Sequence, residues 1–154
     1  MYDSTTETIK HIKQVSDLLW LVIYSIGKRI THHDASKLQE PEKSMYDKFT
    51  PMLRSLTYGS DEYKGTLKEM GSALDHHYQV NSHHPEHYRN GINGMSLIDL
   101  IEMLADWKAA SLRHADGNIL KSLEINKVRF GMSDQLYEIL KNTVTEMGWM
   151  VKED

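Results

Sequence analysis

The histidines of this sequence are grouped in a way that indicates metal chemistry. The 154-residue chain contains nine histidines, and seven of them lie in three short groups, within residues 32–33, 76–77 and 83–87. Imidazole is the most common transition-metal ligand in proteins, and carboxylates often share its sites. Asp34 directly follows the first group, and Asp106 lies in a later apolar segment. These residue types together predict a metal site.

One histidine of the second group, His77, and one of the third, His84, lie on one face of a predicted helix. With Ser60 as its N-cap, this helix is expected to span residues 61–83, and its inward stripe changes from apolar to polar. A buried polar group without a partner costs about 1–3 kcal/mol, and one bound metal would satisfy several such groups. In the alternative interpretation these groups hydrogen-bond to one another or face solvent. The stripe consists of Leu67, Met70, Leu74, His77, Asn81 and His84.

The adjacent pair His33-Asp34 is the other element of the predicted site. It places an imidazole and a carboxylate side by side after a helical segment. A carboxylate can bridge two cations while an imidazole binds one of them. The dipeptide alone is common, so its interpretation depends on the other histidine groups.

Helical periodicity extends over most of the chain. Ser4 and Glu7 form a predicted capping box for a first helix over residues 5–26, with Gly27 just after its end. Pro41 is expected to begin a second helix, and residues 85–94 form a loop after the third. Ser133 and Asp134 open the last helix, and a turn is expected at Asp116-Gly117 before it. The expected inward residues of the last two helices are Leu97, Leu100, Ile101, Leu104, Trp107, Leu136, Ile139, Leu140, Val144 and Met147.

No segment shows the alternation of a strand, so we predict an all-α, single-domain bundle of five or six helices over residues 1–154. The net charge of −4 does not favour a nucleic-acid partner. The apolar run 18–26 is too short to cross a bilayer, so no membrane contact is expected. The absence of cysteine excludes disulfides and thiolate ligands, and a cytoplasmic location is expected.

Two parts of the sequence resemble the HD superfamily of metal-dependent phosphohydrolases. The string His33-Asp34-Ala35-Ser36-Lys37 follows the helix-borne His11 at the spacing of the superfamily's first motif. The string from His83 to Glu86, followed by a helix with Asp106, is similar to the branch that carries His-His-Glu. The Asp-Gly-x-Gly-Tyr-Pro string of that branch is absent, so its cyclic-dinucleotide specificity is not carried over.

A closer resemblance covers most of the chain but implies no function. Small phage and Gram-positive bacterial proteins of unassigned function share three blocks, which correspond here to residues 33–42, 76–86 and 102–111. These blocks read His-Asp-x-Ser-Lys, His-His-x-x-x-Asn-x-His-His-x-Glu and Glu-Met-x-x-Asp. The expected chemistry therefore comes from the wider superfamily.

The superfamily resemblance implies one or two divalent transition-metal ions, with Mn, Fe, Co, Ni and Zn not distinguished. One ion would be bound by His11, His33, Asp34 and Asp106. Asp34 would bridge to a second ion bound by His77 and by His83 or His84. Lys37 and Glu86 would take part in catalysis, and the residues expected to support ligands or bind substrate are Asn81, Glu102 and Arg113.

The activity implied by this resemblance is hydrolysis of a small phosphorylated compound, most simply a nucleotide, by metal-activated hydroxide. Two alternatives stay open at this stage. Some HD-type proteins bind two irons on the same scaffold and activate oxygen. A non-catalytic nucleotide-binding protein would keep the pocket without turnover. The sequence does not specify the oligomeric state.

Overall fold

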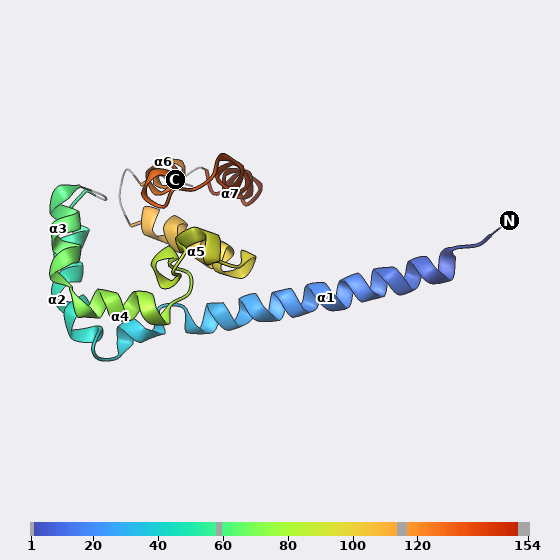
Figure 1. Cartoon of the computed structure of the whole chain (residues 1–154), viewed down its shortest axis with the longest axis horizontal. Helices are drawn as coiled ribbons and strands as arrows, with labels where there is room; N and C mark the ends of the chain where they lie inside the picture. Colours follow the sequence, from blue (N-terminus) through green and yellow to red (C-terminus); the bar gives the residue numbers. More distant parts are fainter. Residues whose placement is uncertain (1, 58–59, 114–116, 151–154) are drawn as a thin grey trace. The chain divides into compact units, whose positions relative to one another are not determined.

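The computed structural model describes residues 2–57, 60–113 and 117–150, and it confirms the all-α fold class (Figure 1). In these ranges there are seven α-helices, three 3-10 helices and no strand. The expected number was five or six, and no separate helix was predicted over residues 119–129. The helices are α1 (Thr5–His32), α2 (Lys43–Arg54), α3 (Asp61–Glu69), α4 (Ser72–Val80), α5 (Leu97–Ser111), α6 (Ile119–Arg129) and α7 (Asp134–Glu146), with 3-10 helices at Ala35–Leu38, Pro85–His87 and Gly91–Gly94.

The chain forms two compact units, Met1–His33 and Asp34–Asp154. The first unit contains α1, and the second contains every other helix. That residues 1–154 form a single domain stays a prediction. The turn expected at Asp116-Gly117 lies partly outside the described residues. No helix in the described ranges is both long and apolar enough to cross a membrane.

Helix α1 is longer than the sequence pattern predicts. Its 28 residues continue through Gly27 to His32, whereas the predicted end was Ile26. A glycine in a helix interior costs about 1 kcal/mol relative to alanine, and the helical turns on both sides of Gly27 outweigh this cost. The predicted capping box at Ser4 is not formed; the Asp3 carboxylate instead accepts hydrogen bonds from the backbone and hydroxyl of Thr5. The helix stops before Asp34, whose φ of 55° lies in the left-handed region that aspartate tolerates.

The helix predicted over residues 61–83 is divided into α3 and α4. Gly71 has a φ of 49°, a left-handed conformation that ends α3 and turns the chain into α4. Helix α4 then ends at Val80, three residues before the predicted end. Ser60 caps α3 by accepting a hydrogen bond from the backbone of Tyr63, as predicted. The break at Gly71 changes which residues share a helix face. Because α4 ends at Val80, His83 and His84 lie on the following loop.

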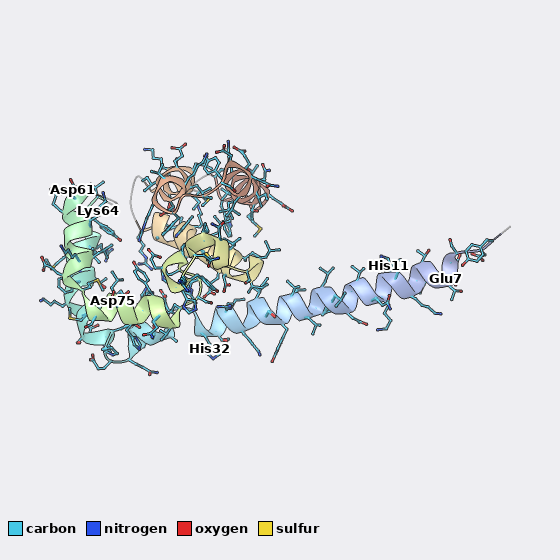
Figure 2. The ribbon with its side chains drawn as sticks, in the orientation of Figure 1. Glu7, His11, His32, Asp61, Lys64 and Asp75 are labelled. Atoms are coloured by element: carbon cyan, nitrogen blue, oxygen red, sulfur yellow. The ribbon has the colours of Figure 1, made fainter. Side chains whose placement is uncertain are left out.

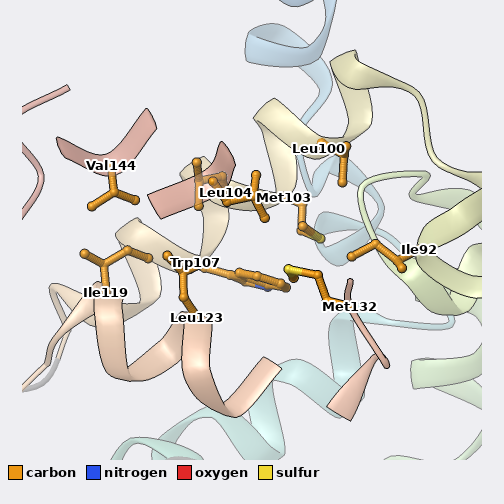
Figure 3. Packing of buried hydrophobic residues seen from close by; sticks show 10 residues of the cluster. Ile92, Leu100, Met103, Leu104, Trp107, Ile119, Leu123, Met132 and Val144 are labelled. Carbon is orange, nitrogen blue, oxygen red and sulfur yellow. The ribbon is translucent and has the colours of Figure 1, made fainter. Parts of the chain in front are cut away.

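The hydrophobic core lies in the second unit, among α5, α6, α7 and the segments around them (Figure 3). Helix α5 begins with a capping box between Ser96 and Asp99, and Ser133 caps α7. This core supports α5, the helix that carries Glu102 and Asp106. Its buried members are Ile92, Leu100, Met103, Leu104, Trp107, Ile119, Leu123, Met132, Leu140 and Val144.

Candidate metal centre

Four side chains of the second unit converge on one point. Asp34 precedes the 3-10 helix Ala35–Leu38, His77 lies in the last turn of α4, and His83 and His84 lie in the loop that follows. Each offers one ligand atom, and these four atoms all lie within 4.8 Å of one another. His77 and His83 are almost fully buried, at 1 % exposure each.

The distances within this cluster suit a single metal ion. Asp34 Oδ1 lies 3.4 Å from His77 Nε2 and 3.5 Å from His83 Nε2. Two ligand atoms about 2.1 Å from a tetrahedral ion are about 3.4 Å apart. His77 Nε2 and His84 Nε2 are closer, at 2.9 Å. Three imidazoles and one carboxylate form a donor set suited to zinc, iron or manganese.

Two carboxylates lie beside the Nδ1 atoms of two of these imidazoles: the fully buried Glu42, and Glu102, whose side chain is 9 % exposed. Glu42 Oε2 accepts from His77 Nδ1 at 2.8 Å, and Glu102 Oε1 lies 3.2 Å from His83 Nδ1. A carboxylate at Nδ1 requires the proton on that nitrogen, so Nε2 carries the lone pair. Carboxylate–histidine pairs of this kind orient metal-binding imidazoles and raise their basicity. The structure thus shows two ligand histidines with their Nε2 atoms turned toward the cluster.

Glu42 is the functional residue that the sequence reasoning missed. It is fully buried, and its Oε1 is 2.7 Å from His76 Nδ1 while Ser36 donates to Oε2 at 3.0 Å. His76 belongs to no ligand group within the described residues, and it shares this carboxylate with His77. The available signal was that the shared block 33–42 ends at Glu42, but a separation of 34 residues between Glu42 and His76 hides their contact in the sequence.

The electrostatics keep the imidazoles in the metal-binding form. Burial, together with the neighbouring His83 and His77, lowers the pKa of His84 to about 3. Burial and the charge of Lys37 also lower the pKa of His77, against the opposing effects of Asp34 and Glu42. Burial and the nearby Asp34 raise the pKa of the Tyr46 phenol. The two histidines are therefore neutral at pH 7, as metal coordination requires.

Lys37 lies at the edge of the cluster. Its ammonium donates to Asp34 Oδ2 and lies 4.9 Å from the centre of the Tyr46 ring. Asp106, on α5, offers a carboxylate oxygen within 4.8 Å of one from Asp34. A cation and a second carboxylate therefore both lie beside Asp34. Lys37 was expected to take part in catalysis, and in this structure its partner is the Asp34 carboxylate.

The other residues of the expected site lie farther from the ligand atoms. The Asn81 amide donates to Ser36 Oγ and to the carbonyl of His77, so it fixes the end of α4. Glu86 forms an ion pair with Arg129 at 2.6 Å. Arg113 follows the end of α5 and is exposed. None of the three belongs to a ligand group within the described residues.

His11 and His33 are not brought together by α1. His33 directly precedes Asp34 and ends the first unit. His11 lies near the start of the same helix (Figure 2), 22 residues earlier, or about 33 Å along a helix that rises 1.5 Å per residue. Two imidazoles so far apart cannot bind one ion within one chain. The expected ligand set relied on a turn after Ile26, and the continuous helix removes that turn.

Glu42 is predicted to tune metal affinity without touching the metal. Replacing Glu42 with glutamine turns one acceptor oxygen into a donor, so one of His76 and His77 loses its acceptor. Loss of such a partner typically weakens metal binding 10- to 100-fold, and we expect a loss of about that size. Competitive titration of zinc against a chelating dye would measure it. Glu40→Gln, two residues earlier and exposed, is the matched control; equal affinities of the two variants would contradict the assigned role of Glu42.

The loop that carries His83 and His84 is fixed by one buried carboxylate. Asp99, 3 % exposed, accepts hydrogen bonds from the side chains of Ser82, Tyr88 and Ser96 and from the Ser96 backbone. Burial alone would raise the pKa of Asp99. The hydrogen bonds from Ser96, Tyr88 and Ser82 outweigh burial and lower the pKa to about 2.

This pKa predicts how stability depends on acidity. A carboxyl group with a pKa of about 3.9 in the unfolded chain and about 2 in the fold contributes about 2–3 kcal/mol to the free energy of unfolding above pH 4. That contribution is lost as the pH falls from about 4 to 2. We expect Asp99→Asn to lower the free energy of unfolding by this amount at pH 7, and by less as the pH falls below about 4. Urea unfolding of metal-free protein from pH 7 to 2 would test it, with the exposed Asp75→Asn as control; a pH-independent difference would refute it.

Comparison with known proteins gives a family but no activity. No curated protein and no solved structure matches the chain. One family model matches residues 1–146, nearly the whole length, and it is described as a family of unknown function. The protein therefore belongs to the family of unknown function DUF5662.

Proposed function

We propose that this protein is a metal-dependent hydrolase of small phosphate esters. The observation that carries the proposal is the cluster of Asp34, His77, His83 and His84, with the carboxylates of Glu42 and Glu102 behind His77 and His83. Purely structural histidines do not need Nε2 atoms turned toward one shared point. A metal site does, and partner carboxylates of this kind accompany metal-binding histidines.

The cluster would hold one divalent ion, and Asp34 and Asp106 would form part of the surroundings of a second. When bound, such an ion lowers the pKa of water and polarises a phosphoryl oxygen. Glu42 and Glu102 keep the imidazoles oriented, and the depressed pKa of His84 keeps that ring neutral. Lys37, held by Asp34, places a cation where an anionic group would approach. The resemblance to the HD superfamily supports phosphate esters as the substrate class.

The test begins with metal content. Protein purified without chelator is expected to contain at least one transition-metal ion per chain by elemental analysis. Titration of stripped protein with manganese, iron, cobalt, nickel and zinc would give the preference. Finding no metal, and no binding of any of the five, would refute the proposal.

Activity is tested separately, by phosphate release from a panel of nucleotides and sugar phosphates. The matched control is His77→Ala purified by the same procedure, because it removes a ligand and exposes any contaminating phosphatase. Metal binding without turnover would favour a binding protein instead. Oxygen uptake after anaerobic iron loading, with no phosphate release, would favour the oxygenase alternative, because this donor set suits iron as well as zinc.

A further inference from the structure

The first unit presents a helix whose apolar side chains have no partner within that unit. Helix α1 contains no buried residue. Eleven of its large apolar side chains, between Ile9 and Ile30, are exposed by 41–76 %. With about 150–250 Å² for a large side chain, they leave on the order of 1,000 Å² open, whereas the largest apolar patch on a monomer is about 300–600 Å². They are Ile9, Ile12, Val15, Leu18, Leu19, Trp20, Leu21, Val22, Ile23, Tyr24 and Ile30.

The apolar residues of α1 follow a heptad repeat. Steps of three and four residues connect Ile9, Ile12, Ser16, Leu19, Ile23, Ile26 and Ile30, and we call this set the α1 seam. Six of its seven members are isoleucine or leucine, over three heptads. Such a seam is the sequence requirement of a coiled coil, in which the a and d positions of two helices interlock. Val15, Trp20 and Val22 flank the seam at the e and g positions and widen it.

We propose that two copies of this protein associate through the α1 seam as a parallel, in-register coiled coil. The single polar member, Ser16, specifies this alignment. In register, the two Ser16 hydroxyls face each other and every other layer pairs apolar side chains. A shifted or antiparallel alignment would bury the hydroxyl against isoleucine or leucine. A lone polar residue at an a position is known to set register in this way.

The available area and the charges agree with a second copy as the occupant. A standard interface buries about 800 Å² on each partner. The exposed apolar surface of α1 is on the order of 1,000 Å², and all of it belongs to the seam and its flanks except the part from Leu18, Leu21 and Tyr24. Helices that lie on anionic membranes have a polar face rich in lysine and arginine. Helix α1 contains four lysine and arginine side chains against two acidic ones, Glu7 and Asp17. Its polar side is therefore mixed rather than uniformly basic, and Lys13 forms an ion pair with Asp17 at 2.7 Å. The proposal is independent of the metal centre.

A single-cysteine experiment tests the register directly. The chain contains no cysteine, so Ser16→Cys introduces the only thiol. In the proposed pair, the two Cys side chains face each other at an a layer, and oxidised glutathione should convert most of the protein into a covalent dimer. Ser25→Cys lies at a c position on the side of the helix, and it should remain a single chain. Equal cross-linking of the two variants, or none for Ser16→Cys, would overturn the proposal.

The mass in solution tests the association itself. Light scattering of the full chain at about 50 μM should give the mass of a dimer. This protein concentration is well above a micromolar dissociation constant. Ile23→Glu, in the seam, should shift it to the mass of one chain, whereas Leu21→Glu, at an f position, should leave the dimer intact. A wild-type chain of monomer mass would overturn the proposal. Monomers that sediment with phosphatidylglycerol vesicles would overturn it in favour of a lipid surface.

Discussion

Replacing Asp34 with alanine is expected to remove at least one metal ion per chain and to lower turnover by several orders of magnitude. Asp34 supplies the carboxylate of the four-residue cluster, and its Oδ1 lies 3.4 Å from His77 Nε2 and 3.5 Å from His83 Nε2. Without it, only three imidazoles remain, and no carboxylate of the cluster balances a divalent cation. The activation of water by the ion would be lost with the ion.

The backbone at Asp34 calls for a second variant. Its φ of 55° is costly for most residues, about 1–2 kcal/mol in the left-handed region, whereas asparagine adopts it readily. Asp34→Asn therefore removes the charge while it keeps the turn between α1 and the following 3-10 helix. A loss of metal in both variants identifies the carboxylate as the cause. A loss in the alanine variant alone would identify the backbone.

His32→Ala is the control for position. His32 lies two residues from Asp34 in the last turn of α1, where its Nδ1 contacts the carbonyl of Lys28 and the hydroxyl of Thr31. It belongs to no ligand group in the described part of the chain. Metal content, melting temperature and turnover should stay close to those of the wild type. Similar behaviour of His32→Ala and Asp34→Ala would mean that the His-Asp pair is not the centre of the site.

The helical nature of the chain followed from local pattern alone, because caps and apolar periodicity act within a few residues. Ser60 and Ser133 were predicted as N-caps, and both accept a backbone hydrogen bond in the structure. Helix interruptions were harder to predict. A glycine can be accommodated in a helix, as Gly27 is, or can take a left-handed φ and end one, as Gly71 does. Packing around each glycine decides between the two, and the local sequence does not contain that information.

Which apolar residues of each core helix are buried was only partly predictable. Leu100, Leu104 and Leu140 are buried as expected, but Ile101 and Ile139, from the same apolar stripes, are 44 % and 51 % exposed. An apolar stripe can be wider than the surface that covers it. Which edge is buried depends on the crossing of α5, α6 and α7, a tertiary property that periodicity does not encode.

The candidate site shows the same division between local and tertiary information. His77 and His84 were placed together because both follow one stripe, and Asp34 because it adjoins a histidine. Glu42 could not be placed, since its partners His76 and His77 lie more than 30 residues away. Only the three-dimensional structure shows that Glu42, which follows the His-Asp motif, lies beside the end of α4. Residues that support ligands are thus harder to find from sequence than the ligands are.

Replacing Leu123 with alanine is expected to cause a large loss of stability. Leu123 lies in the middle of α6 with 0 % exposure, in the cluster formed with α5 and α7. Truncation of a buried leucine removes three carbons and leaves a cavity, at a cost of about 2–5 kcal/mol. For a domain that is stable by about 5–15 kcal/mol, this is a large fraction of the free energy of unfolding. Urea unfolding followed by tryptophan fluorescence would measure it.

Val128→Ala is the matched control, because Val128 lies on the same helix with 84 % exposure. Alanine favours the helix more than valine does, by a few tenths of a kcal/mol, so this variant should be unchanged or slightly more stable. At a temperature where both variants are folded, metal affinity should equal that of the wild type, because neither side chain contacts the ligand cluster. A Leu123→Ala protein that unfolds like Val128→Ala would show that α6 does not pack on α5 and α7 as described. A folded Leu123→Ala protein that binds metal much more weakly would show that this core positions the ligands as well as stabilising the unit.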